Sequence, residues 1–224
     1  VYEEKNMSLT RDNSKVQEAI FSSLFPKHPY GTQTVLGTQE NLKNPSITNI
    51  KNYYKQWYVP NNMAICMSGD LDPDATIALI DKYFGGLKPN PELPKLDLPK
   101  EAPITQPVEK EVLGPDAESV ALAWRFPGVS DKDFEILQVV SQVLYNGKAG
   151  LIDLDLNQQQ KVLNSYGYPM GLADYSALLL GGLPKQGQTL EEVKDLLLSE
   201  IKKLRAGEFD EKMLEANINN FKLG

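Results

Sequence analysis

Hydrophobic positions in the first part of the chain recur mostly three or four residues apart. This spacing predicts helices, because it gathers the apolar side chains on one face of a 3.6-residue turn. Capping residues and helix breakers mark where these segments begin and end. The predicted elements are a helical stretch over Val1–Leu24 with a break at Asp12-Asn13, a loop over Lys27–Thr38, a helix capped by Ser46 and ended by Pro60, and a helix capped by Asp72 and ended by Gly85-Gly86.

A short apolar run, Met63–Met67, lies between two of these helices. It is brief and is followed by turn residues, so it predicts a buried strand. Cys66 lies inside the run and is predicted to be a small buried hydrophobe. Because it is the only cysteine in the sequence, an internal disulfide and a thiolate zinc cluster are both excluded.

The second part of the chain mixes apolar runs with helical patterns. The predicted strands are Val108–Leu113, Ser119–Phe126, Val162–Met170 and Ser176–Leu183. The predicted helices are one capped by Asp131, one over Gly150–Gln160, one opened by a capping box of Thr189 and Glu192 and ended by Gly207, and one capped by Asp210. Short strands beside turns, without strict βαβ alternation, predict an α+β fold with largely antiparallel sheets and helices packed on them.

A proline-rich stretch separates the two parts. Residues 88–107 contain six of the fifteen prolines, which predicts an extended connector, since proline fixes φ and removes a backbone donor. We therefore expect a first domain over residues 1–87 and a second over 108–224. Helical patterns run to both ends of the sequence, so we expect the chain to be cut from a longer protein, with the second domain incomplete at its C-terminus.

Composition narrows the class of protein. The chain has 224 residues, 41% of them hydrophobic and 24% charged, and a net charge of -7. The acidic balance argues against a general nucleic-acid binder, which needs a basic face. No apolar stretch reaches the roughly 20 residues that span a bilayer, and we expect no signal peptide within these residues, which says nothing about a longer parent protein. We expect a soluble protein whose compartment stays unknown, with the periplasm or another cell-envelope compartment as the guess for a bacterial source.

Few residues in the sequence suggest chemistry by themselves. His28 is the only histidine, so no site within the chain can hold zinc between two histidines. By itself, a lone histidine in a loop is expected to be structural or solvated. Glu3 and Glu4 are adjacent on a predicted helix, where side chains point about 100° apart, so only one can face a given site. By themselves they predict a solvated acidic face.

Several short phrases, in this order and spacing, resemble the pitrilysin/insulinase family of zinc metallopeptidases. No single phrase is specific, but together they cover nearly the whole chain. They are Val1-Tyr2-Glu3-Glu4, Leu24–Gly31 with His28-Pro29-Tyr30-Gly31, Gly37–Leu42, Tyr58–Asn62, Gly69-Asp70, Lys82–Leu87, Phe126-Pro127-Gly128, Asn146-Gly147 and Leu204–Glu208.

The resemblance implies a fold and a metal site. Such enzymes are similar to inverted zincins, in which an H-x-x-E-H helix supplies two histidine ligands and a glutamate base, and a downstream glutamate completes the zinc site. Glu4 matches that downstream glutamate, so the resemblance implies Glu4 as a metal ligand. It implies no catalytic residue within these 224 residues, because the base and the histidines lie upstream. The domains would be similar to those of mitochondrial processing peptidase.

The resemblance also implies a function and partners. The zinc would activate a water for hydrolysis of peptide bonds in peptides or unfolded segments. Residues 1–87 would finish the catalytic domain, and residues 108–224 would form its non-catalytic partner. The expected partners are peptide substrates and the other half of the peptidase, on the same chain or a separate subunit. The chain alone is expected to be inactive, and His28 is expected to cap or brace its loop.

Two features leave alternatives open. The H-x-x-E-H segment is absent from the sequence, and Leu156 is followed by Asn157 and glutamines where relatives often place an arginine. The chain could therefore come from a non-catalytic partner half of the same architecture that binds peptides without cleaving them. A generic α+β interaction domain is a third possibility.

Overall fold

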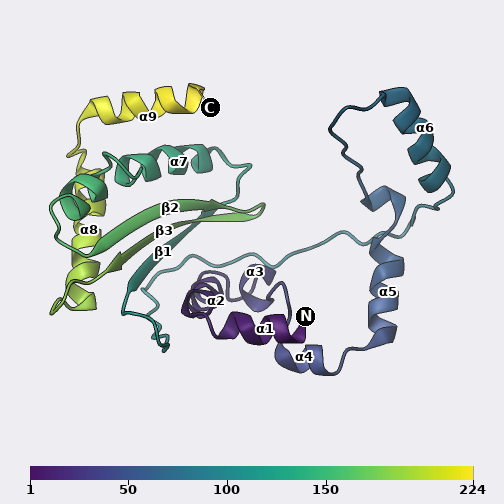
Figure 1. The fold of residues 1–224 in the computed structure, drawn as a ribbon, viewed down its shortest axis with the longest axis horizontal. Coiled ribbons are helices and arrows are strands. Elements are labelled where there is room, and N and C mark those ends of the chain that lie inside the picture. The colour runs from purple at the N-terminus through teal and green to yellow at the C-terminus, as the bar shows by residue number, and fades with distance from the viewer. Residues whose placement is uncertain (224) are drawn as a thin grey trace. The chain divides into compact units, whose positions relative to one another are not determined.

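The computed structural model describes residues 1–223 and divides the chain into two compact units. Unit 1 contains Val1–Thr10 and Lys27–Ala102, and unit 2 contains Arg11–Pro26 and Pro103–Gly224 (Figure 1). The second unit thus includes a segment that precedes the connector in the sequence. The assignment of a catalytic and a non-catalytic domain stays a prediction.

The regular secondary structure of unit 1 consists of helices, joined by irregular segments, among the residues that the structure describes. Two of its helices begin at the predicted caps: the Ser46 hydroxyl accepts from the backbone N–H of Asn49 at 3.2 Å, and the Asp72 carboxylate accepts from that of Ala75 at 2.8 Å. Each contact satisfies a donor that the first turn leaves open. The loop predicted over Lys27–Thr38 contains a short helix, Pro29–Thr32, and the helix Gln39–Lys43 was not predicted. The helices are α1 (Tyr2–Leu9), α3 (Pro29–Thr32), α4 (Gln39–Lys43), α5 (Ile47–Trp57) and α6 (Pro73–Phe84), with a 3-10 turn η1 (Pro60–Asn62).

The strand predicted at Met63–Met67 is wrong, and so is the burial of Cys66. The run has no regular secondary structure, Cys66 is exposed, and 59% of Met67 is accessible to solvent. A strand needs a neighbour to pair its backbone groups, and none lies beside this run among the residues described in unit 1. The apolar composition of Met63–Met67 predicts burial, but no segment described in unit 1 covers these side chains.

Unit 2 is built on a three-stranded antiparallel sheet with the order β1-β3-β2. The strands are β1 (Val120–Pro127), β2 (Asn164–Gly171) and β3 (Tyr175–Leu183). Strands β2 and β3 form a hairpin, and β1 pairs with the other edge of β3, with Leu122 opposite Leu180. The α+β class is confirmed. The strand predicted at Val108–Leu113 is wrong, because residues 85–119 contain no helix or strand.

Helices of unit 2 begin at the predicted caps Asp131 and Thr189, whereas the helix that starts at Asp12 has no side-chain cap. Thr189 and Glu192 form the capping box, with the Glu192 carboxylate accepting from the Thr189 N–H at 2.8 Å, and Gly207 ends that helix with φ 72°. Glycine adopts this left-handed conformation without the strain of a side chain. The helices are α2 (Asp12–Leu24), α7 (Lys132–Leu144), α8 (Leu190–Ala206) and α9 (Glu211–Leu223), with a π-helical turn η2 (Asp153–Asn157) inside the predicted helix Gly150–Gln160.

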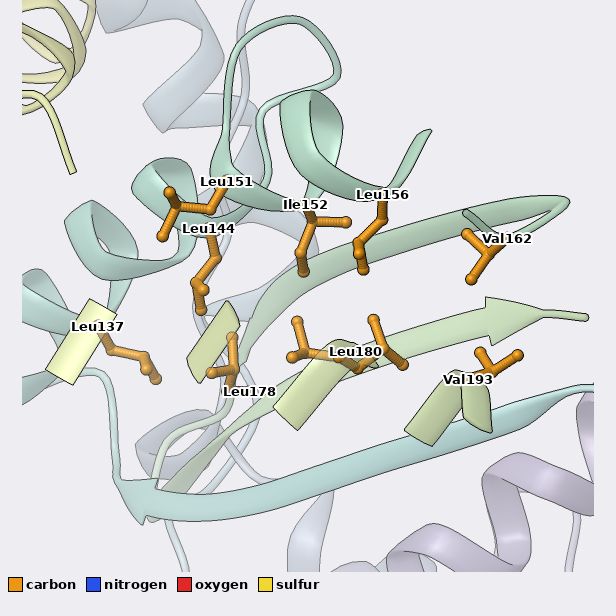
Figure 2. Packing of buried hydrophobic residues seen from close by; sticks show 10 residues of the cluster. Leu137, Leu144, Leu151, Ile152, Leu156, Val162, Leu178, Leu180 and Val193 are labelled. Atoms are coloured by element: carbon orange, nitrogen blue, oxygen red, sulfur yellow. The ribbon is translucent and has the colours of Figure 1, made fainter. Parts of the chain in front are cut away.

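The core of unit 2 lies between one face of the sheet and helices α7 and α8. Leu178 and Leu180 on β3 point toward Leu137 and Leu144 of α7 and toward Val193 of α8 (Figure 2). These side chains are 8% exposed or less. Gly182 continues the same face, where an added Cβ would lie 2.5 Å from Cγ1 of Val193. The glycine therefore allows α8 to approach the sheet closely.

Helix α2 packs against the opposite face of the sheet at β1. The Arg125 guanidinium donates to the backbone carbonyl of Leu24, and the rings of Phe25 and Tyr175 lie 5.6 Å apart. At the other end of α2, the Asp12 carboxylate accepts from the backbone N–H of Asp116 at 2.9 Å. This bond is the main cause of a lowered pKa at Asp12. Contacts at both ends thus hold α2 in unit 2.

Candidate functional site

Glu4 lies in the first turn of α1, on an exposed face of the helix. Its side chain is 68% accessible, and its carboxylate lies 3.6 Å from the amino group of Val1. Tyr2 and Asn6 are four residues apart and therefore lie on the same face of α1. This face is turned to α4, because the Asn6 side chain accepts from the Gln39 side chain at 2.6 Å and the Lys43 ammonium lies over the Tyr2 ring. Glu4, two positions from each, is directed away from α4.

Glu3 is also exposed, and its direction differs from that of Glu4 by about 100°. The helix therefore presents two carboxylates that cannot share one close ligand position. The role of Glu4 as a metal ligand stays a proposal.

His28 has a structural role in unit 1, as predicted. It is 1% exposed, and its Nδ1 accepts from the backbone N–H of Tyr30 at 3.3 Å, which caps the short helix α3. Its own backbone N–H donates to the Glu101 carboxylate at 2.7 Å. The imidazole also packs edge-on against the Tyr30 ring, with 4.2 Å between the two ring centroids. These contacts brace the loop around Pro29.

No group of three or more histidine, cysteine, aspartate or glutamate side chains that could hold a metal ion occurs among the described residues. Glu4 is one carboxylate, and His28 is engaged in capping. A zinc site in proteins takes three or four protein ligands. The residues present therefore do not fit a zinc site by themselves, and we derive no catalytic step through a metal.

Unit 2 contains a charged cluster between α8 and η2. The Lys203 ammonium lies 2.9 Å from the Glu200 carboxylate and 2.5 Å from that of Asp155. Burial raises the pKa of Glu200, although Lys203 opposes this effect, and the residue is 1% exposed. The hydrogen bond from Lys203 lowers the pKa of Asp155 and raises that of Lys203. The lysine thus bridges one partly exposed carboxylate, that of Asp155, and one buried carboxylate, that of Glu200.

Glu200→Gln is expected to raise the melting temperature of the chain at pH 7 by a few degrees. A group with a raised folded pKa stabilises the fold below its unfolded pKa, and this contribution is lost as pH rises through the folded pKa. For Glu200 the loss begins above the ordinary value of 4.5. The gain over the unmodified chain should therefore shrink as pH falls to about 4, as measured by thermal unfolding.

The matched control is Glu191→Gln, on the same helix but exposed, where an ion pair contributes little. It should change the melting temperature far less. A lower melting temperature for Glu200→Gln at pH 7 would show that the attraction of Lys203 exceeds the cost of burying this carboxylate.

Most of the chain matches one known family. Residues 46–221 match the family model described as the peptidase M16 inactive domain. The zinc protease PqqE of Helicobacter pylori is 27% identical over 203 residues, which cover 87% of this chain and 45% of that protein. The uncharacterised zinc protease YmxG of Bacillus subtilis is 22% identical over 202 residues, covering 86% and 47%. The chain thus spans about half the length of these curated relatives.

The fold is also found among solved structures. The crystal structure of a protease from Helicobacter pylori matches with a TM-score of 0.78 at 24% identity, over 99% of this chain and 54% of that one. This likeness covers helices of unit 1 as well as the sheet of unit 2, so it bears on the fold of the whole chain. Among the described residues, no helix is long and apolar enough to span a bilayer. The family match covers more than half of the chain, and the protein therefore belongs to the peptidase M16 inactive-domain family.

Proposed function

We propose that this chain forms part of a zinc-dependent endopeptidase that acts on peptides or unfolded segments. The main support is the alignment with a relative named a zinc protease, which extends over 87% of the chain. That alignment is too long to be confined to either compact unit. Because the chain belongs to a peptidase family, the hypothesis of a generic α+β interaction domain is no longer needed to account for its fold.

The two units have different parts in this proposal. Unit 2 is the non-catalytic domain in this proposal; the matching inactive-domain model covers most of it, over residues 46–221, and also extends into unit 1. Unit 1 contributes Glu4 as one carboxylate ligand of zinc, presented on the open face of α1. The remaining ligands and the general base come from residues outside this chain, so these 224 residues alone should be inactive.

The proposal is tested on the longer protein that contains this chain. We expect about one zinc per catalytic site by metal analysis, and cleavage of a quenched fluorescent peptide that stops with a chelator and returns with zinc. The 224-residue chain alone should retain no zinc after desalting, because one carboxylate is too few ligands. Chelator-resistant cleavage by the longer protein would contradict the proposal.

A non-catalytic partner half is the second candidate function. It is favoured by the description of the matching family as an inactive domain. This candidate predicts that the longer protein binds the same peptide, detected by fluorescence anisotropy, but releases no product with added zinc. The sequence immediately upstream of Val1 separates the two, since an intact H-x-x-E-H favours the enzyme.

A further inference from the structure

A pocket with a mainly apolar lining and a few polar groups lies in unit 2, where the end of α7, the loop after it and the first turns of α9 meet. Its volume is about 390 Å³, and its polar lining comes from Gln142 and Asn146 near the end of α7, Lys148 in the loop, and Lys212 and Asn217 on α9. Helix α9 packs on α7 (Figure 1). The pocket is separate from α1, so nothing about it depends on Glu4.

Asn217 is the buried donor of this pocket. The residue is 5% exposed, and its side-chain nitrogen Nδ2 is buried with no hydrogen-bond partner among the described residues. Folded proteins rarely bury an amide donor without a partner, because the lost hydration is not replaced. An acceptor atom in the pocket would satisfy this donor.

The charges at the pocket favour an anion. Lys148 and Lys212 line it, and neither forms an ion pair within the part of the chain that the structure describes. The buried carboxylate of Asp153 does not line the pocket, and it accepts from the backbone N–H groups of Asn146 at 3.0 Å and Gly150 at 2.9 Å. These bonds hold the loop that carries Lys148.

The end of α7 is also shielded from an incoming anion. Carbonyl groups at a helix C-terminus repel negative charge, but the Asn146 side chain donates to the carbonyl of Gln142 at 3.0 Å. The remaining groups in the pocket are mostly donors: two ammonium groups, the Asn217 amide nitrogen and the Gln142 amide, which can turn either way. A ligand must therefore supply acceptors and negative charge.

We propose that this pocket binds a small carboxylate, which accepts a hydrogen bond from Asn217 and is neutralised by Lys148 and Lys212. The volume suits a ligand of a few heavy atoms or the last residues of a peptide. The carboxylate could come from a free dicarboxylate or from a peptide C-terminus. Both present the same planar pair of acceptor oxygens.

The test is an NMR titration of the 15N-labelled chain with three probes: succinate, tetraalanine with a free C-terminus, and tetraalanine amide. Carboxylate binding predicts that the free acids shift the Asn217 side-chain NH₂ signals, while the amide does not. Shifts with succinate alone assign the site to free carboxylates, and shifts with the peptide acid alone assign it to peptide C-termini. If neither acid shifts these signals at millimolar concentration, or if the amide shifts them equally, the proposal is wrong.

Variants locate the binding. Asn217→Leu keeps a similar volume and removes the donor, and Lys212→Glu reverses one charge; each should weaken binding about tenfold or more. Lys202→Glu is the matched control, since Lys202 is an exposed lysine on α8 outside the pocket. If Lys202→Glu weakens carboxylate binding as much as Lys212→Glu does, binding depends on the net charge of the protein and not on this pocket. Should Asn217→Leu not fold, the comparison of the two lysine variants still decides the question.

Discussion

Glu4→Gln in the longer protein is expected to lower both zinc occupancy and peptide cleavage, by about 100-fold or more in cleavage. Mutations of groups that merely support a metal ligand already cost about 10–100-fold in affinity or activity, so the loss of a direct ligand should cost at least as much. Glutamine is similar in size but lacks the charge that a carboxylate offers a dication. The measurements are metal content after desalting and the rate of cleavage of a quenched peptide.

Glu3→Gln is the matched control for this experiment. It makes the same chemical change one position earlier, on a side chain that is also exposed and points about 100° away. It should leave zinc content and cleavage unchanged. The assignment of Glu4 is wrong if the two variants have equal effects or if neither has any effect. That result would not affect the proposal that the pocket between α7 and α9 binds a carboxylate.

Leu197→Ala is expected to destabilise unit 2 by about 2–5 kcal/mol, the usual range for removing a buried leucine side chain. Leu197 is fully buried on α8 and belongs to the cluster between that helix and the sheet. Its removal leaves a cavity that the packed leucines of β3 and α7 cannot fill without moving. The free energy of unfolding is measured by urea denaturation followed by circular dichroism.

Leu163→Ala deletes the same atoms at a position that is 67% exposed. It should change the free energy of unfolding by less than about 0.5 kcal/mol, as surface substitutions usually do. Similar losses at Leu163 and Leu197 would mean that burial at α8 does not determine the stability of this unit.

Local signals in the sequence predicted the longer helices well but missed the short helices α3 and α4. A cap needs only residues within one turn, so Ser46, Asp72 and Thr189 could be identified without knowledge of the rest of the fold. The strands β1 and β3 were also recognisable, because both are apolar runs that find partners in the same sheet. The break in the first helical stretch occurs at Thr10–Arg11, shortly before the predicted position.

Features that depend on distant partners were not predictable in the same way. Met63–Met67 has strand composition, but pairing is decided by what lies beside it, and that information is not local. The pocket between α7 and α9 was also missed. The one residue in the sequence that could have indicated it is Asn217. It follows Met213 by four residues and so lies on the same face of α9, directed to α7, where helical periodicity favours an apolar residue.

The route of the chain has a consequence for how this protein can be divided. Residues 11–26 come before the connector but pack with the strands that follow it, so the polypeptide passes from one unit to the other at three points. A recombinant product that starts at Pro103 would therefore lack α2 and would leave Arg125 and Tyr175 without the surface they normally contact. To produce unit 2 by itself, residues 11–26 must be included, either fused to the rest through a new linker or added as a separate peptide.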